Sequence, residues 1–365
     1  MDTTANDIEF DEDGVCNFCK SYEQRIIHIN SNREQSDKYL LELVQKIKRD
    51  GENERYDCIV GISGGVDSSW VLVQAVKLGL RPLAVHLDNG WNSELAQKNI
   101  ENLVNRLGVD LYTKVLDWNE FRDLQKSFFD ADVLDIELLT DNFLVELNYQ
   151  QAKKYKCKYI LSGSNTATEG IPMPTNWAAQ SKYNKSAIQN IWKKKGKAYR
   201  LKTIKMLSLG QYHWNVHVRK TKWIRFLDLM DYEKGAAIRH LEDDYGYVPY
   251  LYKHYESVFT RIYQGIILPR KFNVDKRKNH LSAEIMAGEI TRPQALEQLK
   301  GIPFSSASEM QADEDFFLKK FNWSKLQFDE YLARPEVRLG SYGSDIDLLK
   351  YVRPIRNFYR SITEK

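Results

Sequence analysis

The stretch Ile59-Val60-Gly61-Ile62-Ser63-Gly64-Gly65-Val66-Asp67-Ser68-Ser69 decides the fold of this chain. An apolar run leads into a glycine pair, hydroxyls and a carboxylate, which predicts a strand, a turn and the start of a helix. Gly64 and Gly65 allow positive φ and let bare backbone approach a ligand, and Asp67 or Ser68 can cap the helix that follows. Backbone N–H groups at a helix N-terminus favour an anion, chiefly phosphate. We call residues 63–69 the Ser63–Ser69 turn.

Two common phosphate-binding motifs do not fit this turn. No lysine follows it, as the Walker motif Gly-x-x-x-x-Gly-Lys-Ser/Thr requires, and Gly-x-Gly-x-x-Gly is absent. Ser-Gly-Gly-x-Asp-Ser directly after a hydrophobic strand instead resembles the loop of the N-type ATP pyrophosphatases (PP-loop enzymes), which cleave ATP between its α- and β-phosphates. An ordinary strand-to-helix turn is the alternative, and the six specified positions argue against it.

Length and composition indicate a globular protein. The chain has 365 residues, 42% of them apolar, enough for one large domain or two. No apolar run is long enough to span a membrane, and the N-terminus is acidic where a signal peptide would be basic, so we expect a cytoplasmic protein. A net charge of +3 is too slight to argue for nucleic acid.

The four cysteines fall into two kinds. Cys58 and Cys157 lie in or beside predicted strands, where the expected role is that of a small buried hydrophobe. Cys16 and Cys19 form Cys-Asn-Phe-Cys, the spacing of half a zinc site, but structural zinc needs four ligands and no second pair follows. By spacing alone, metal binding stays open.

Strands and helices alternate through the middle of the chain. An amphipathic helix over 30–51 precedes the alternation, which predicts right-handed βαβ crossovers and an α/β fold with a doubly wound parallel sheet. The expected strands are 58–62, 82–87, 111–116 and 159–161, and the expected helices are 69–78, 93–107, 118–129 and 138–155.

Ligands of such sheets sit beyond the carboxyl ends of the strands. That rule selects three loops, Ser63–Ser69, His86–Asn92 and Leu161–Gly170, the latter two being strand ends that run into small and polar residues. Because the three loops fall at one edge, we expect them to contact the same ligand.

A closer resemblance covers most of the chain. The blocks that carry it are Asp57–Gly61 with the turn, Pro82–Ala96, Leu161–Gly163 with Ala167–Gly170, Lys253–Arg261, Leu268–Phe272 and Asp275–Arg277. These blocks are similar to the N-acetyl sugar amidotransferases of surface-polysaccharide (lipopolysaccharide O-antigen) biosynthesis. The resemblance implies an ATP-dependent ligase that converts the acetamido group of a nucleotide-activated sugar to acetamidino and releases AMP and pyrophosphate.

The resemblance also implies roles for particular residues. Transfer of AMP to the amide oxygen gives an imidate that ammonia can attack, so the protein needs only to hold ATP, Mg²⁺ and sugar in line. Asp67, near the Mg²⁺, and Ser63 are the candidate catalytic residues. Nucleotide binding falls to Ser63, Gly64, Gly65, Val66, Asp67, Ser68, Ser69, His86, Leu87, Asp88 and Gly163, and substrate binding to Asn89, Trp91, Asn165, Thr168, Glu169, Glu256, Arg261, Lys271 and Arg277.

The N-terminus departs from the resembled family. There, another Cys-x-x-Cys normally precedes the stretch that corresponds to Met-Asp-Thr-Thr, and Cys16 and Cys19 supply the second pair of a Zn²⁺ site. Either Met1 is an internal methionine of a longer reading frame, or this member has lost its zinc.

A basic, aromatic-rich region extends from Trp177 to Arg225 and includes Tyr199 and Arg200. A solvated face is one interpretation; the others are binding of RNA, of the diphosphate and base of a nucleotide sugar, or of an acidic partner protein. Some ATP pyrophosphatases modify tRNA, so a PP-loop tRNA-modifying enzyme is the alternative function, weakened by the near-neutral total charge. A nucleotide-binding sensor is a third class, and Asp67 and the long segment after Asp228 argue against it.

The composition becomes helical after Asp228. Expected helices cover 232–245, 252–267, 316–321 and 328–332, and Thr291-Arg292-Pro293-Gln294 predicts a capping box. Within 252–267, Glu256, Thr260 and Gln264 form one polar stripe. We expect an N-terminal segment (1–50), an ATP pyrophosphatase domain (51–228) and a mainly helical domain (229–365).

No part of the chain predicts a source of ammonia. A triad glutaminase would need a cysteine nucleophile in an elbow turn, and none of the four cysteines has that setting. The resemblance implies delivery by a separate glutaminase with a cyclase-like subunit, for which the basic region is a candidate docking face.

Overall fold

Five parallel strands form the centre of the computed structural model, which describes residues 1–31, 33–178, 181–197, 201–250 and 255–345. The order is β3-β2-β1-β4-β5, with Val60 paired to Ala84 on one side and to Leu161 on the other. This arrangement confirms the doubly wound parallel sheet. The strands are β1 (Cys58–Gly61), β2 (Pro82–Asp88), β3 (Leu111–Val115), β4 (Tyr159–Ser162) and β5 (Lys222–Arg225).

Helices pack on both faces of the sheet, and alternate strand residues enter two separate cores. Val60 and Ala84 join the core formed with α2 (Arg33–Gly51), α3 (Val66–Lys77) and α4 (Glu94–Leu107). Ile59 and Leu83 face the opposite core, which includes α5 (Trp118–Asp130) and α6 (Leu138–Lys154). Burial on both faces explains why β1 and β2 are continuous apolar runs. Cys58 and Cys157 are buried, as expected.

Several elements were not expected from the sequence, among them a helix before α2 and the fifth strand. Helix α1 (Asn17–Ser31) precedes α2, and β5 lies inside the basic region. The four residues Lys222–Arg225 are mostly exposed at the edge of the sheet, so they show no apolar pattern that would predict a strand. The start of α3 also differs: it begins at Val66 with Gly65 at the N-cap and no side-chain cap, so neither Asp67 nor Ser68 caps it.

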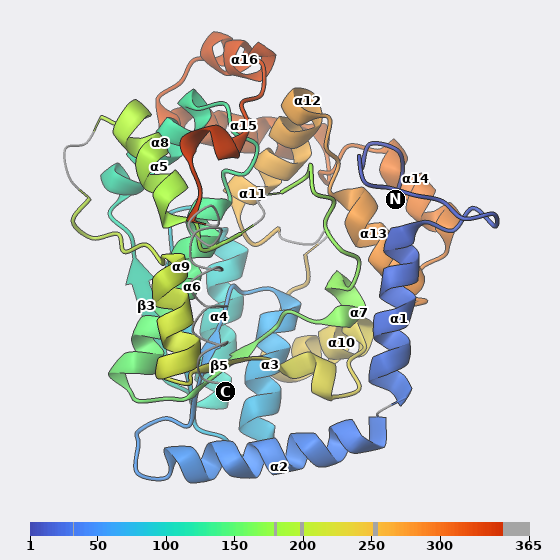
Figure 1. Ribbon diagram of the computed structural model, residues 1–365, viewed down its shortest axis with the longest axis vertical. Helices are drawn as coiled ribbons and strands as arrows, with labels where there is room; N and C mark the ends of the chain where they lie inside the picture. Colours follow the sequence, from blue (N-terminus) through green and yellow to red (C-terminus); the bar gives the residue numbers. More distant parts are fainter. Residues whose placement is uncertain (32, 179–180, 198–200, 251–254, 346–365) are drawn as a thin grey trace, which may run out of the picture.

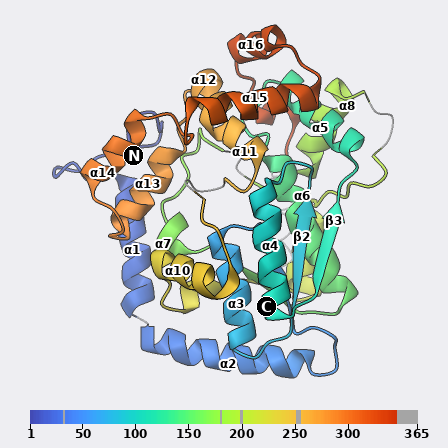
Figure 2. The same ribbon diagram turned by 180° about the vertical axis from the view of Figure 1, so that it is seen from behind.

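A helical region spans residues 234–342; its helices after Ser257 lie toward the carboxyl ends of the strands, whereas α10 (Lys234–Tyr245) packs beside α3 and α4 (Figures 1 and 2). The helix expected over 252–267 is only partly correct. Residues 252–254 fall outside the described residues, α11 (Val258–Ile262) continues into a π-helical turn, η3 (Tyr263–Ile267), and α12 (Leu268–Phe272) follows. The capping box at Thr291 is confirmed. The other helices of this region are α13 (Arg277–Met286), α14 (Arg292–Lys300), α15 (Ala307–Phe321), α16 (Lys325–Ala333) and η4 (Leu339–Tyr342).

The remaining short elements connect β4 to the helical region. They are α7 (Thr166–Glu169), α8 (Lys185–Lys195), α9 (Leu209–His213), the π-helical η1 (Trp214–Val218) and η2 (Phe226–Leu229). Among the described residues, no helix is both long and apolar enough to cross a membrane. The three-part division at residues 50 and 228 stays a prediction.

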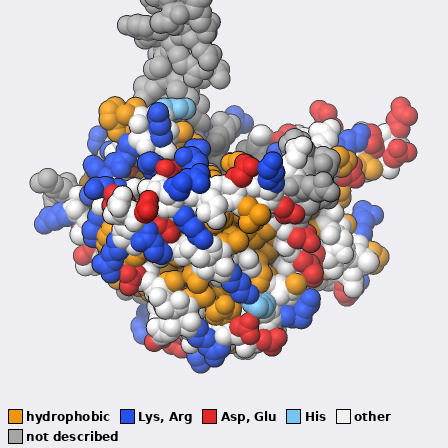
Figure 3. All heavy atoms as spheres, turned by 90° about the horizontal axis from the view of Figure 1, so that it is seen from below, with side chains coloured by type: hydrophobic (Ala, Val, Ile, Leu, Met, Phe, Trp, Pro, Cys, Tyr) orange, Lys and Arg blue, Asp and Glu red, His pale blue; other side chains and the backbone are white. Residues whose placement is uncertain are grey.

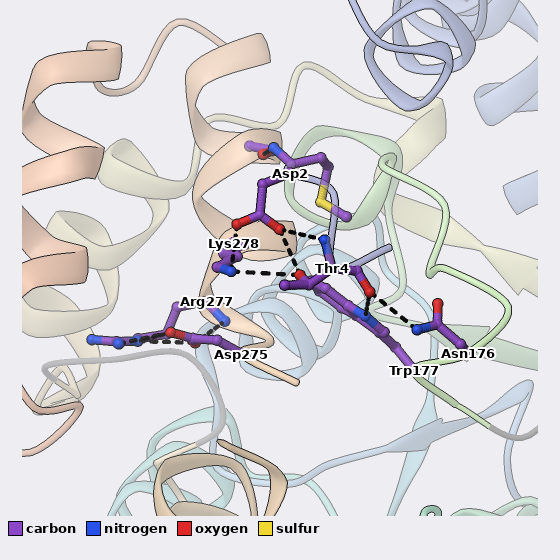
Figure 4. A network of polar contacts seen from close by, with 9 residues as sticks. Asp2, Thr4, Asn176, Trp177, Asp275, Arg277 and Lys278 are labelled. Atoms are coloured by element: carbon purple, nitrogen blue, oxygen red, sulfur yellow. Dashed lines mark hydrogen bonds and ion pairs between the residues drawn. The ribbon is translucent and has the colours of Figure 1, made fainter. Parts of the chain in front are cut away.

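The N-terminal segment ties the stretch that follows the third loop to the helical region (Figure 4). Asp2 pairs with Lys278 of α13 at 2.5 Å, and the carbonyl of Thr4 accepts hydrogen bonds from Asn176 and Trp177. Residues from three distant parts of the sequence are therefore joined beside the carboxyl edge of the sheet.

Candidate functional site

The Ser63–Ser69 turn is braced by its own hydroxyls. Ser63 Oγ accepts from the N–H of Gly65, and Ser68 Oγ accepts from the N–H of Ser63, both at 3.2 Å. Gly64 has φ +86°, and a Cβ there would lie 2.8 Å from the carbonyl oxygen of Ala96 in α4, so only glycine fits. Ser69 is buried in α3, and its N–H donates to the carbonyl of Gly65 at 3.1 Å.

The third loop meets this turn where the strand order reverses, between β1 and β4. A Cβ on Gly163 would lie 2.8 Å from the backbone nitrogen of Ser68, so the third loop and the Ser63–Ser69 turn are in direct contact. Asn165 is buried and caps α7 by accepting from the N–H of Thr168 at 2.8 Å, a structural role rather than a free substrate contact. Glu169 is exposed at the end of α7. The turn thus occupies the topological switch point where such sheets bind ligands.

Asp67 lies at the centre of this junction. Its Oδ2 accepts from Thr168 Oγ1 at 3.3 Å, and its Oδ1 accepts a short hydrogen bond from the hydroxyl of Tyr232. Tyr232 is largely buried, and burial together with the charge of Asp67 raises the pKa of this phenol. Two hydroxyls from different parts of the chain therefore fix the carboxylate that the sequence singles out.

A second layer of charge surrounds Asp67. Lys234 pairs with Glu284 of α13 at 2.9 Å. Burial raises the pKa of Glu289, and the charges of Glu284 and Asp67 add to this shift against the opposing effect of Lys234. Sequence reasoning missed Tyr232 and Lys234 as site residues, because they stand at the start of the expected amphipathic helix 232–245 and carry no motif.

The helical region contributes Glu256 to the same turn. Asn92 and Ser257 form an antiparallel bridge, in which the N–H of Ser93 donates to the carbonyl of Glu256 at 2.9 Å. A Cβ on Gly65 would lie 3.3 Å from a carboxylate oxygen of Glu256. The structure thus brings together Asp67, Thr168 and Glu256 from the turn, the third loop and the helical region.

The second loop is held by its own side chains. His86 is buried; its Nδ1 donates to the carbonyl of Ile62 at 2.9 Å, and its Nε2 accepts from the side-chain amide of Asn92 at 2.8 Å. Burial lowers the pKa of His86, which keeps the ring neutral. Asp88 Oδ1 accepts from the N–H of Gly90, and the amide of Asn89 donates to Thr140 Oγ1.

Trp91, expected to bind substrate, is instead fully buried. Its ring packs among Phe259, Phe317 and Phe321, and its indole N–H donates to Gln125 at 2.9 Å. The expectation is wrong because an aromatic ring at the end of a polar loop can satisfy its one donor inside the protein and pack with its apolar faces.

Three basic residues expected to grip the substrate have carboxylate partners of the protein's own. The ammonium of Lys271 is fully buried, 3.0 Å from Asp132, and also donates to the carbonyls of Tyr331 and Arg334. Arg277 makes a fork-like pair with Asp275 (Figure 4). Arg261 pairs with Asp313 at 2.7 Å. The complete burial of the Lys271 side chain contradicts its expected contact with substrate. The side chains of Arg261 and Arg277 are partly exposed, and their contacts with substrate stay predictions.

A Mg²⁺ ion fits this site only in part. Mg²⁺ is usually held by one or two carboxylates together with phosphate oxygens and water. Asp67 supplies such a carboxylate beside the turn, whereas the described residues contain no group of three candidate ligands that would hold an ion without phosphate.

The zinc site has two candidate ligands at most. Cys16 is buried, and burial together with the neighbouring thiol of Cys16 raises the pKa of Cys19 to about 11. No third His, Cys, Asp or Glu joins them among the described residues. The residues present do not fit a closed structural zinc site, which needs four ligands.

Two hollows of about 380 and 240 Å³ lie over the α6 side of the sheet. Leu87 and Lys205 line the smaller one, and Trp192 and Lys205 line the larger. Neither is lined by the Ser63–Ser69 turn, so the candidate site rests on the contacts between the loops and not on these hollows.

The basic region is divided between core and surface. Trp177 is fully buried, whereas Trp214 is 60% exposed and Trp223 37% exposed; Tyr199 and Arg200 lie outside the described residues. Seen from the side of the molecule that carries α2, Lys and Arg side chains gather toward one edge, and Asp and Glu side chains toward the opposite edge (Figure 3). The exposed part of the basic region is compatible with a solvated face and with binding of RNA, a nucleotide sugar or an acidic partner protein.

One family model matches the chain, over residues 256–353, and is described as the WbpG-like LPS biosynthesis protein, C-terminal domain. This match begins at Glu256, the residue that reaches the turn. A search of curated proteins finds no match.

Solved structures similar to this chain include three described enzymes or subunits. An NMN synthetase from Francisella tularensis is 16% identical, covers 70% of this chain and 93% of its own, and has a TM-score of 0.32. A predicted subunit of a tRNA methyltransferase from Methanocaldococcus jannaschii is 16% identical, covers 51% of this chain and 75% of its own, and has a TM-score of 0.29. An NH3-dependent NAD synthetase from Campylobacter jejuni in complex with nitrate is 13% identical, covers 57% of this chain and 83% of its own, and has a TM-score of 0.30.

Proposed function

We propose that this protein is an ATP-dependent, AMP-forming amidotransferase that converts the acetamido group of a nucleotide-activated N-acetyl sugar to acetamidino in lipopolysaccharide biosynthesis. The observation that carries the proposal is the junction at Asp67. A Ser-Gly-Gly-x-Asp-Ser turn, the third loop and Glu256 meet there. The WbpG-like match over 256–353 supports a role in lipopolysaccharide biosynthesis, because it covers the region that completes this junction.

The Ser63–Ser69 turn would hold the phosphates of ATP. The hydroxyls of Ser63 and Ser68 now satisfy N–H groups of the turn, and phosphate oxygens can take over those donors when ATP binds. Asp67 would hold Mg²⁺ against these phosphates; when bound, the ion supplies positive charge that neutralises the departing pyrophosphate.

The reaction balances without a further co-reactant. The amide oxygen of the sugar attacks the α-phosphorus of ATP, and the bond to pyrophosphate breaks. Ammonia then attacks the imidate carbon, and AMP leaves with the former amide oxygen. The turn and the third loop need only align the amide with the α-phosphate, which is where most of the acceleration of such a step arises.

The ammonia would come from a separate glutaminase with a cyclase-like subunit, and we place the reaction in the cytoplasm. The basic region supports docking of a partner, since it combines lysine and arginine side chains with the exposed Trp214.

The test is pyrophosphate release from ATP and Mg²⁺, with ammonium chloride as nitrogen donor, across nucleotide-activated N-acetyl sugars and bulk tRNA. We expect release with a sugar, and a product about one mass unit lighter as C=O becomes C=NH. Release only with tRNA would instead support a tRNA-modifying enzyme. ATP binding without any release would support a sensor.

A further inference from the structure

A polar cluster between α6 and the helical region lies at the far end of the stripe that begins at Glu256. Its members are Glu137, Gln264 and Lys276, and we call it the Glu137 cluster. Glu137 Oε2 accepts from Gln264 Nε2 and from Lys276 Nζ, both at 3.3 Å. All three side chains are partly buried, so each has lost water without being closed off from a ligand.

The cluster is connected to the second loop of the candidate site. Glu137 immediately precedes α6, and Thr140 in the first turn of α6 receives the amide of Asn89 from the second loop. Tyr263, in the π-helical turn next to Gln264, donates a hydrogen bond to the carbonyl of Leu134. Such turns within α-helices are often found at functional sites. Sequence reasoning missed Glu137, because acidic residues at a helix start are usually explained by the helix dipole.

The charges of the surrounding residues limit what the cluster can bind. The pKa of Lys276 is raised: burial lowers it, but Glu137, Asp135 and Asp141 outweigh that effect. Lys182 pairs with Asp141 at 2.9 Å, and Asp141 raises the pKa of Lys182. The three carboxylates, of Glu137, Asp135 and Asp141, outnumber the ammonium groups of Lys276 and Lys182. The resulting negative charge disfavours binding of a bare diphosphate. Carboxylate, amide and ammonium groups together can accept from and donate to hydroxyls.

Distance along the stripe fixes which part of the substrate reaches the cluster. Glu256 precedes α11 by two residues, and Gln264 lies in η3, more than one helical turn beyond the start of α11. The reacting amide must lie at the turn beside Glu256. A group near Gln264 is therefore remote from the reacting carbon.

We infer that Glu137, Gln264 and Lys276 recognise hydroxyl groups of the sugar substrate that lie remote from the reacting acetamido group. The inference rests on the proposed function and deepens it, because it assigns sugar specificity to the junction between α6 and η3. Gln264 and Lys276 would donate to sugar oxygens, and Glu137 would accept from a hydroxyl while it orients both donors.

The test replaces Gln264 by methionine, which keeps the length of the side chain and removes its polar atoms. We expect the KM for the nucleotide sugar to rise about five- to tenfold, the loss of one hydrogen bond, with kcat and the KM for ATP changed less than about twofold. A sugar analogue that lacks the contacted hydroxyl should bind wild-type protein as weakly as the variant binds the complete sugar. The variant should not distinguish the two sugars.

Gln150→Met is the matched control. Its amide donates to Glu146 at 2.9 Å, the same kind of contact on the other side of α6, and the change should leave both KM values unaltered. If wild-type protein turns over a nucleotide sugar and Gln264→Met has the same KM for that sugar, the inference is overturned and the proposed function is not. Absence of pyrophosphate release with every nucleotide sugar in wild-type protein would overturn the proposed function and the inference together.

Discussion

Charged side chains are held in opposite ways at the Ser63–Ser69 turn and in the helical region. At the turn, Asp67 is fixed by the neutral hydroxyls of Thr168 and Tyr232. In the helical region, Lys271 faces the carboxylate of Asp132. A hydroxyl orients a carboxylate without cancelling its charge, whereas an opposite charge at close range neutralises it. The first arrangement is suited to binding and the second to stability.

Replacing Asp67 by alanine tests the first half of this comparison and should have the largest effect. We expect pyrophosphate release to fall on the order of a thousandfold, as when a preorganised charge is removed from a reaction site, with the fold intact. Steady-state release and circular dichroism measure the two quantities. Asp329→Ala on α16 is the control, and activity above a tenth of wild type in Asp67→Ala would contradict the role given to this carboxylate.

Replacing Lys271 by methionine tests the second half. Removing the ammonium leaves Asp132 with Arg334 as a cationic partner at 3.0 Å and takes the donor from the buried carbonyls of Tyr331 and Arg334. We therefore expect the free energy of unfolding to fall by about 1 to 3 kcal/mol in urea titrations. Lys300→Met, which breaks the exposed pair with Glu297, should cost less than about 1 kcal/mol. If the two changes lowered the free energy of unfolding equally, burial would not account for the difference in stability that we expect between these pairs.

Replacing Tyr232 by phenylalanine sharpens the comparison. The hydroxyl donates to a charged acceptor, a contact worth about 1.5 to 3 kcal/mol, so release should slow roughly 10- to 100-fold and require more Mg²⁺. Tyr331→Phe is the matched control, because that buried hydroxyl has no hydrogen-bond partner among the described residues. A variant with normal activity and an unchanged Mg²⁺ titration would assign Tyr232 to packing alone.

The smallest expected effect is a pH dependence carried by His86. Burial lowers the pKa of His86 in the folded protein, so the unfolded chain takes up a proton first. The contribution of the neutral ring is complete above the unfolded pKa of about 6.5 and decreases as the pH falls below it, by at most about 1.4 kcal/mol per pH unit. His86→Gln should remove this slope between pH 6.5 and 5 in unfolding titrations. An equal slope in both proteins would assign it to other groups.

The sheet and the turn could be predicted because their signals are local. An apolar run that ends in Ser63-Gly64-Gly65 predicts a strand, a turn whose backbone can approach a neighbouring group closely, and the start of a helix, all within a few residues. The neighbouring strands repeat the same pattern, and the rule for carboxyl edges then places Thr168 near Asp67, a contact the structure contains.

The partners of the charged residues in the helical region could not be predicted in the same way. Whether Lys271 or Arg277 meets a ligand depends on which carboxylate the tertiary fold brings to it, and Asp132 is more than a hundred residues away from Lys271. Tyr232 and Glu137 were missed for the same reason. Neither belongs to a motif, and each gains its position from a contact across the chain.

The antiparallel bridge between Asn92 and Ser257 has a consequence for dissecting the protein into parts. Its two hydrogen bonds join the loop after β2 to the beginning of the helical region, and Glu256 reaches the turn through them. A chain cut between residues 246 and 255 would separate the segment that carries Glu256 from the sheet. We therefore expect the two fragments to be inactive singly and to regain activity on mixing, as a complementing pair whose reassembly reports on this junction.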